Sequence, residues 1–368
     1  MMTGRYRTVV AGLPLVFFAC AKKPPADFAP DPGLVGRIDS IRIIVPSAVC
    51  PGATIPAQYE AVLDDGSLIP FATKYDDDHP PPLHVVFLSR YSPAAVALEN
   101  GYWATSDDPL SSALEGVPLQ VIFRAKPGVI GRATVAPVYG CAEHAFGFEG
   151  ATGGRGGQGG RGPDVAVRMG LLSSPFVSRL IVAEIAVEQA PPFHVLADAD
   201  QVPPADWIIV GADGARGGRG VDGRSGRAGT AGQPGCPGTP GGAGGAGGDG
   251  GPGGPGGSGG RVTIIVPDSD PFLAGLVDAR SEGGEGGQGG KAGKGGAGGA
   301  GGAAQGDPRR CKAGSSGANG PDGRSGRDGP EGQRGSRPQV LTVPGSAFGA
   351  RPDPRLEALI NYHEGARR

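Results

Sequence analysis

The sequence predicts an all-β protein with little helix: a small β-sandwich, then short strands that alternate with glycine runs in polyproline-II or polyglycine-II geometry. Three observations predict this. Short β-branched runs bounded by Pro, Gly or Asp-Gly recur over residues 37–145, and such runs indicate strands. Glycine then occupies every third position over four long stretches. With 72 Gly, 37 Pro and 6% aromatic residues among 368, the composition approaches that of fibrous chains and leaves little material for a large core.

In the sandwich segment, the expected strands share β-branched residues and nearby turn signals: Ile41–Pro46, Ala57–Leu63, His84–Leu88, Val117–Phe123 and Arg132–Val138. Leu119, Val121 and Phe123 alternate with less apolar residues, as in a strand with one buried face. Asp64-Asp65-Gly66 supplies a turn. Several short strands of this kind predict a small β-sandwich over 37–145.

The motifs "AVLDDGS", "ALENGYWATSDDP" and "ATVAPVYGC" within 36–142 resemble bacterial Ig-like domains of surface adhesins. The resemblance implies an Ig-like sandwich with a binding or structural role. Domains of that family usually lack a disulfide, so cysteines at positions 50 and 141 depart from its pattern.

The glycine stretches cover residues 147–164, 211–261, 284–304 and 314–337. A chain in polyproline-II geometry turns once every three residues, so every third side chain points the same way. Where that direction faces another chain segment, only glycine fits. Two assemblies meet this condition: one chain folded back into a polyglycine-II bundle, or a collagen-like trimer. Few triplets contain Pro and none is Gly-Pro-Pro, whereas collagen carries roughly 15–20% Pro and hydroxyproline. We therefore expect a monomeric bundle, with a homotrimer and a flexible linker as the alternatives.

Apolar segments enter or leave these runs: Asp164–Val167, Trp207–Val210, Arg261–Val266, Leu276–Ala279 and Gln339–Val343. The repeated order of a strand, a glycine run and a second strand predicts a sheet whose connecting glycine runs pack side by side. This layout over 147–344 resembles the glycine-rich region of anaplastic-lymphoma-kinase-type receptors and of some phage tail adhesins. After this region, spanning 146–345, residues 346–368 form a tail or a short helix, with Leu356, Leu359 and Ile360 on one face.

The N-terminus predicts export. Arg5 and Arg7 precede an apolar run over 9–19, which is too short to span a membrane and has the layout of a signal peptide over 1–19. Ala19-Cys20 resembles a bacterial lipobox, although Phe17 stands where that family usually has Leu. The resemblance implies lipidation of Cys20, a membrane anchor and tether over 20–36, and an outer-membrane lipoprotein, because Ala21 follows the cysteine.

The other four cysteines suit an exported protein. If Cys20 carries lipid, Cys50, Cys141, Cys236 and Cys311 remain, and four cysteines outside the cytoplasm suggest two disulfides. Three pairings are possible. The domain layout favours Cys50–Cys141 and Cys236–Cys311.

The residues nominate no catalytic, cofactor or metal site. The five His have no metal-ligand spacing, and the G-x-G-x-x-G strings arise from the triplets without a βαβ context. Asp76-Asp77-Asp78-His79 could hold Ca²⁺, but a solvated acidic loop is the simpler interpretation. The net charge of −2 gives no reason to expect a nucleic-acid partner.

Two function classes remain. The first is a non-enzymatic surface protein, structural or adhesive, with the glycine region as a stiff platform. The second is a ligand-binding Ig-like module, for an extracellular protein or glycan, displayed on a collagen-like stalk. A binding role predicts an exposed aromatic cluster near Tyr91, Tyr102 and Trp103, whereas a purely structural role predicts that these rings are buried.

Overall fold

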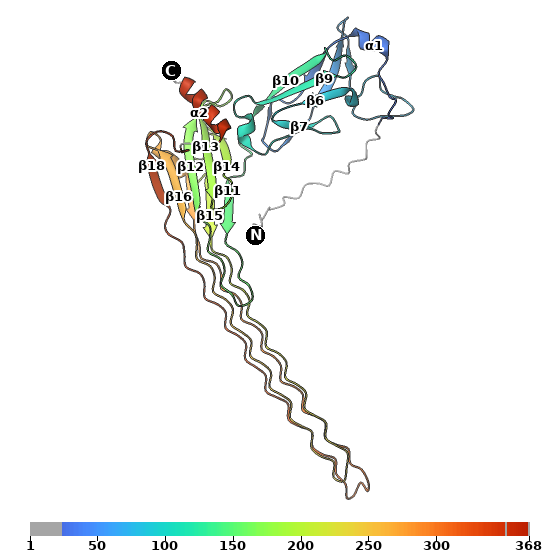
Figure 1. The fold of residues 1–368 in the computed structure, drawn as a ribbon, viewed down its shortest axis with the longest axis vertical. Helices are drawn as coiled ribbons and strands as arrows, with labels where there is room; N and C mark the ends of the chain where they lie inside the picture. Colours follow the sequence, from blue (N-terminus) through green and yellow to red (C-terminus); the bar gives the residue numbers. More distant parts are fainter. Residues whose placement is uncertain (1–23, 350–351, 367–368) are drawn as a thin grey trace.

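The all-β fold class is confirmed. A computed structural model describes residues 24–349 and 352–366, and it consists mainly of strands in five sheets. Figure 1 shows two β modules next to each other, with a long rod of side-by-side chain segments leaving the second one. The expected signal peptide over 1–19 and the lipidation site Cys20 lie outside the described residues.

The first module contains three small sheets around one core. Their orders are β1-β4-β5, β2-β10-β9-β6 and β3-β8-β7. The strands are β1 (Ile38–Ile44), β2 (Ala48–Val49), β3 (Thr54–Ile55), β4 (Gln58–Leu63), β5 (Leu68–Pro70), β6 (Leu88–Tyr91), β7 (Ala95–Ala97), β8 (Trp103–Thr105), β9 (Val117–Phe123) and β10 (Ile130–Pro137). Two 3-10 turns, η1 (Val85–Phe87) and η2 (Pro109–Ser112), lie between them.

The core of this module follows from alternation. In β9 every second residue, from Val117 to Phe123, is buried, as the sequence pattern predicts for a strand with one buried face. Trp103 is fully buried, and its indole N–H donates to the Tyr59 hydroxyl at 2.8 Å. Tyr59 in turn donates to the Gly101 carbonyl at 2.6 Å, so both buried polar atoms are satisfied.

Two expectations for this module need correction. The strand expected over His84–Leu88 is a 3-10 turn, because the His84 Nδ1 accepts the Val86 N–H at 3.1 Å and starts a helical turn. The strand begins only at Leu88. The expected tether over 20–36 is not all linker either. Asp31 caps a helix, α1 (Pro32–Arg37), and Leu34 and Val35 pack against the core.

The second module is a two-layer sandwich. One sheet has the order β14-β13-β12-β16-β18 and the other β11-β15-β17. Their strands are β11 (Ala145–Glu149), β12 (Val165–Leu172), β13 (Leu180–Val187), β14 (Phe193–Asp198), β15 (Ile208–Asp213), β16 (Val262–Pro267), β17 (Val277–Arg280) and β18 (Gln339–Val343), and η3 (Pro271–Leu276) precedes β17. Buried Val, Ile, Met and Trp side chains from both sheets form the core between the layers.

A third core joins the two modules and the C-terminal helix α2 (Pro354–Ala366). Leu356 and Leu359 of α2 are fully buried against Leu110, Tyr139 and Phe348. The segment over 346–368 thus contains a docked helix, whose apolar face closes one end of the second module, and Arg355 adds an ion pair to Asp108 at 2.7 Å.

Candidate functional site

The glycine rod is the most distinctive feature of the molecule. It is built from a hairpin (residues 150–163) and four long runs, which we call run A (214–235), run B (238–260), run C (281–303) and run D (314–336). All of them belong to one chain. At about 3.1 Å of rise per residue in this geometry, run A alone is about 70 Å long.

The two sheets of the second module continue directly into the rod. Strands β11, β15 and β17, which are parallel neighbours, lead into the first hairpin arm, run A and run C. Strands β12, β16 and β18, also parallel neighbours, receive the second hairpin arm, run B and run D. The sheet order therefore fixes the order of the glycine segments, and Figure 1 shows them leaving the sheet side by side.

Backbone hydrogen bonds then join the segments along the whole rod. Run A is parallel to run C, with Gly223 N–H donating to the Lys291 carbonyl at 2.8 Å. Run B is antiparallel to runs A and C: Gly248 N–H donates to the Arg224 carbonyl at 2.7 Å, and Gly293 N–H donates to the Gly248 carbonyl at 2.9 Å. Equivalent bonds repeat every three residues. The regular ladder satisfies backbone groups that a flexible linker would leave to water.

The number of glycines per triplet follows the number of neighbours. Beyond the hairpin, runs A and D each bond to two other runs, whereas runs B and C each bond to three. Runs A and D read mainly Gly-X-Y, whereas runs B and C read mainly Gly-Gly-X. A third neighbour brings a backbone close to a second of the three side-chain directions. In run C this makes a second glycine necessary, whereas in run B beyond the hairpin the second direction is narrowed but not closed.

The close approach of neighbouring backbones explains this requirement. A Cβ on Gly223 of run A would overlap the Gly248 carbonyl oxygen. In run C the first-position glycines form one row and the second-position glycines another, and neither row has room for a side chain. A Cβ on Gly286 would overlap Gly329, and one on Gly287 would overlap Gly218. Ala292 interrupts the first of these rows, and nothing in the structure explains it.

In run B the first-position glycines have no room for a side chain, whereas the second-position glycines lack that room along only part of the run. A Cβ on Gly244 would overlap the Gly296 carbonyl oxygen, whereas one on Gly245 would find its nearest atom, Arg227 N, at 3.2 Å. Nearer the sheets, the hairpin covers this second row, and a Cβ on Gly257 would overlap the Gly160 carbonyl. The second row is therefore closed only where the hairpin packs on it.

Short polar side chains add a second kind of bond between runs. Asp322 and Asp328 of run D accept the N–H groups of Gly295 and Gly289 of run C at 2.6 and 2.7 Å. Asp222 of run A accepts the Lys291 N–H at 2.8 Å. That backbone hydrogen bond is the main reason that the pKa of Asp222 lies below its ordinary value. Each of these aspartates is the third residue of its Gly-X-Y triplet, and its carboxylate accepts a hydrogen bond in place of a backbone carbonyl.

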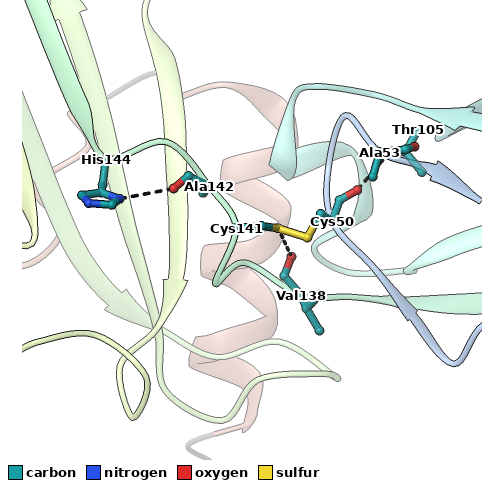
Figure 2. Close-up of a disulfide and its surroundings, with 7 residues drawn as sticks. All are labelled: Cys50, Ala53, Thr105, Val138, Cys141, Ala142 and His144. Atoms are coloured by element: carbon teal, nitrogen blue, oxygen red, sulfur yellow. Dashed lines mark hydrogen bonds between the residues drawn. A yellow bond between two sulfur atoms is a disulfide. The ribbon is translucent and has the colours of Figure 1, made fainter. Parts of the chain in front are cut away.

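One disulfide closes the far end of the rod, and the other links the two modules. Cys236 pairs with Cys311 and joins the turn between runs A and B to the turn between runs C and D, at the far end of the rod. Cys50 pairs with Cys141 and joins the first module to the segment that leads into β11. In Figure 2 the Thr105 hydroxyl lies beside this link, where it donates to the carbonyls of Cys50 and Ala53 at 3.1 and 2.8 Å. These are the pairs that the domain layout favours, and two disulfides indicate an exported protein.

A cavity of about 830 Å³ lies between η2, strands β12 to β14 and the segment before α2. Its ionisable groups lie close to one another: Arg168 contacts Glu184 at 2.7 Å, and His194 lies 3.6 Å from Glu184. The neighbouring His194 imidazole is the largest cause that lowers the pKa of Glu184, although burial opposes it. No motif in the sequence predicts this cluster. A lone Glu inside "LIVAEIAV" is the signal that could have found it, because a buried carboxylate needs partners.

The remaining candidate residues do not come together. Trp103 is buried, whereas Tyr91 and Tyr102 are exposed, so the three rings form no joint surface cluster. Within the described residues, no group of three or more His, Cys, Asp or Glu side chains could hold a metal ion, the 76–79 loop included. No helix in the described part of the chain is long and apolar enough to cross a membrane.

Comparison with known proteins gives no relative. No family model matches the chain, and neither a curated protein nor a solved structure matches it significantly.

Proposed function

We propose that the protein is a non-enzymatic, exported surface protein in which the glycine rod acts as a stiff structural or adhesive platform. The observation that carries this proposal is the rod itself: four runs of one chain, bonded to one another at every triplet and closed by a disulfide at the far end. Such an arrangement holds the tip of the rod at a fixed distance from the second module, whereas a flexible linker of the same length would not.

The non-enzymatic part of the proposal rests on the cavity. Arg168, Glu184 and His194 form a mutual network, and Arg355 pairs with Asp108 and Asp353. Ionisable groups that already contact one another in this way favour a structural role at the junction of the modules over proton transfer to a substrate.

We further propose that lipidation of Cys20 anchors the protein to the outer membrane. Replacing Cys20 with Ser should move the protein from the membrane fraction to the soluble fraction, because several acyl chains hold a protein firmly whereas none leaves it free. A wild-type protein that is already soluble and begins at an unmodified Cys20 would contradict the anchor.

The alternative role, ligand binding by an Ig-like first module, has less support. Tyr91 and Tyr102 are exposed, but Trp103 lies in the core with its N–H bonded to Tyr59. The ring with the largest contact area is thus not free to bind a ligand.

Small-angle scattering on residues 24–368 tests the platform. A stiff rod predicts one maximum dimension that stays constant with protein concentration and moderate salt. A broad distance distribution, as for a coil, would refute the platform, and a mass of three chains would indicate the trimer.

A further inference from the structure

One broad face of the rod carries four arginines that form no ion pair with any acid of the described chain. Runs A and D are the outer runs, and both lie next to run B. The carbonyls of Arg224 and Arg227 in run A accept N–H groups of run B, and so do those of Arg324 and Arg327 in run D. All four residues stand at the second position of their triplets and are exposed.

Each glycine run is a polyproline-II-type helix with three residues per turn, and this symmetry determines where its side chains point. In a Gly-X-Y run the first position faces inward, so the second and third point outward in two directions about 120° apart. Third-position Asp222, Asp322 and Asp328 reach run C with their carboxylates. The second positions therefore lie on the other side, around run B, where a Cβ on Gly251 would lie 3.8 Å from the Cβ of second-position Val221.

The two faces differ sharply in charge. Around run B, the second positions of runs A and D and the third positions of run B contain four cations and one acid: Arg224, Arg227, Arg324, Arg327 and Asp249. Around run C, the outward positions are close to balanced, with cations at Arg216, Arg219, Lys291, Lys294 and Arg334 and acids at Asp222, Glu282, Glu285, Asp322, Asp328 and Glu331.

Pairing strengthens the difference. On the run C face, Arg216 lies 3.7 Å from Glu285, Arg219 lies 3.0 Å from Asp222, and Arg334 pairs with Glu282 at 2.8 Å. On the run B face, the one acid, Asp249, uses its carboxylate to accept the backbone N–H of Arg324 at 2.7 Å. Four guanidinium groups therefore face solvent with no acidic partner among the residues that the structure describes.

We propose that the run B face binds a linear polysaccharide that carries an anionic group, sulfate or carboxylate, at regular intervals. The hydrogen-bond register places Arg227, Arg224, Arg324 and Arg327 opposite Gly245, Gly248, Gly250 and Gly253 of run B, which is about 25 Å along the rod at 3.1 Å per residue. Two rows of cations on a straight support suit an extended polyanion, and guanidinium groups bind sulfate and carboxylate with two parallel hydrogen bonds.

The surface between the rows fits a sugar chain better than a nucleic acid. Run B presents only Ala, Asp, Pro, Ser and Gly there over residues 241–260. This stretch offers no aromatic ring on which bases could stack, as single-strand binders require. The disulfides also indicate that the protein works outside the cytoplasm.

The test is binding of the full exported chain to immobilised heparin, which is sulfated, and to hyaluronate, which is carboxylated, at several salt concentrations. We expect the wild type to bind at least one of them, with an affinity that falls as salt rises because counterions are released on binding. The variant Arg224→Ala/Arg227→Ala/Arg324→Ala/Arg327→Ala should lose roughly tenfold or more in affinity and show a weaker salt dependence.

The matched control removes four cations from the other face: Arg216→Ala/Arg219→Ala/Lys291→Ala/Lys294→Ala. It has the same net charge as the first variant and should keep most of the affinity. Equal losses in both variants, or no wild-type binding to either polysaccharide, would overturn the proposal. Duplex DNA bound as tightly as the polysaccharides would overturn the assignment of the ligand.

Folding is checked by thermal melting of each variant. If the fourfold variant melts lower than the wild type, the two double variants, Arg224→Ala/Arg227→Ala and Arg324→Ala/Arg327→Ala, carry the test, each with an expected partial loss. The inference rests on the proposed role as an exported rod. A wild type that keeps its rod dimensions in scattering but does not bind overturns only the inference, whereas a coil-like profile overturns both.

Discussion

At the scale of single residues, glycines that look alike in the sequence have different environments. Gly244 and Gly245 are adjacent members of one Gly-Gly-Ala triplet in run B. Gly244 faces run C, where an added methyl group meets the Gly296 carbonyl, whereas Gly245 faces more open space beside Arg227. The first position therefore has a strict requirement for glycine and the second a weak one.

We predict that Gly244→Ala lowers the stability by a few kcal/mol, as overpacking does, and that Gly245→Ala changes it by less than about 1 kcal/mol. Thermal unfolding of both variants at two protein concentrations measures this. Equal melting of the two variants would contradict a packed rod. A melting temperature that rises with concentration would point to a trimer instead.

The sequence predicts part of this distinction. A strict period of three predicts that the first glycine is packed, because only one direction of the helix recurs at that spacing. The second glycine could not be assigned from the period, since its surroundings depend on which backbone lies next to it, and these surroundings differ between runs B and C although each run has three neighbours. The Glu184–His194 contact was missed for a similar reason, because it arises from the pairing of β13 with β14.

A second prediction concerns Asp353, which precedes α2. Its carboxylate accepts the Arg355 N–H at 2.9 Å, like an N-cap, and also binds the Arg355 guanidinium. The side-chain hydrogen bond to Arg355 is the main cause that lowers the pKa of Asp353 from 3.8 to about 2. A carboxylate with a lowered pKa in the folded state stabilises the protein above its unfolded pKa, and this contribution is lost as the pH falls from about 4 to 2.

The comparison is between wild type and Asp353→Asn, with hydrogen exchange of the α2 amides measured from pH 5 to pH 2. Protection in the wild type, corrected for intrinsic exchange, should drop more steeply than in the variant between pH 4 and 2. Parallel curves would show that Asp353 does not stabilise the docked helix.

At the scale of elements, most strands next to glycine runs were predictable because apolar β-branched residues contrast with glycine. The exception is β11, which was not expected because the glycine period begins inside it at Gly147. Expected Arg261–Val266 corresponds to β16, and Gln339–Val343 is β18 with the same bounds. The strands β13 and β14 were not singled out, although they extend one sheet beyond the rod. They have no glycine run at either end, so the feature that marked the other strands is absent.

The distal disulfide gives a third prediction. Cys236–Cys311 joins the two turns at the far end, and its loop spans 75 residues of sequence. Replacing both cysteines with Ser should let the runs fray from the tip, because the turns are no longer held together. We expect faster protease cleavage within 233–240 and 303–313 while the sandwich stays intact.

The double variant Cys50→Ser/Cys141→Ser is the control, since it removes the other disulfide at the junction of the modules. Its new cleavage sites should lie near residues 138–144, with the tip unchanged. Cleavage at the same places in both double variants would indicate global loosening, contrary to local closure of the rod.

At the scale of the whole molecule, the rod continues the architecture of the sandwich. The two layers of β-strands are held apart by their apolar side chains. Once glycine replaces those side chains, the layers approach until their backbones bond directly. Because each run returns beside the previous one with the same three-residue register, the length of the rod is set by the number of triplets, which must match among the four long runs.

Shortening the rod in register tests this rule. The hydrogen bonds align residues 223–228 of run A with 244–249 of run B, 291–296 of run C and 320–325 of run D. Deleting these four segments together removes two triplets from every run and keeps each remaining contact in phase. We expect a folded protein with the tip disulfide formed and a maximum dimension in scattering shorter by up to about 19 Å, which is six residues at 3.1 Å each.

Deleting only 223–228 leaves run A out of step with its neighbours and should lower the melting temperature and expose the tip to protease. If both deletions behaved alike, the runs would not be in register, and the rod would be no more than a collection of linkers.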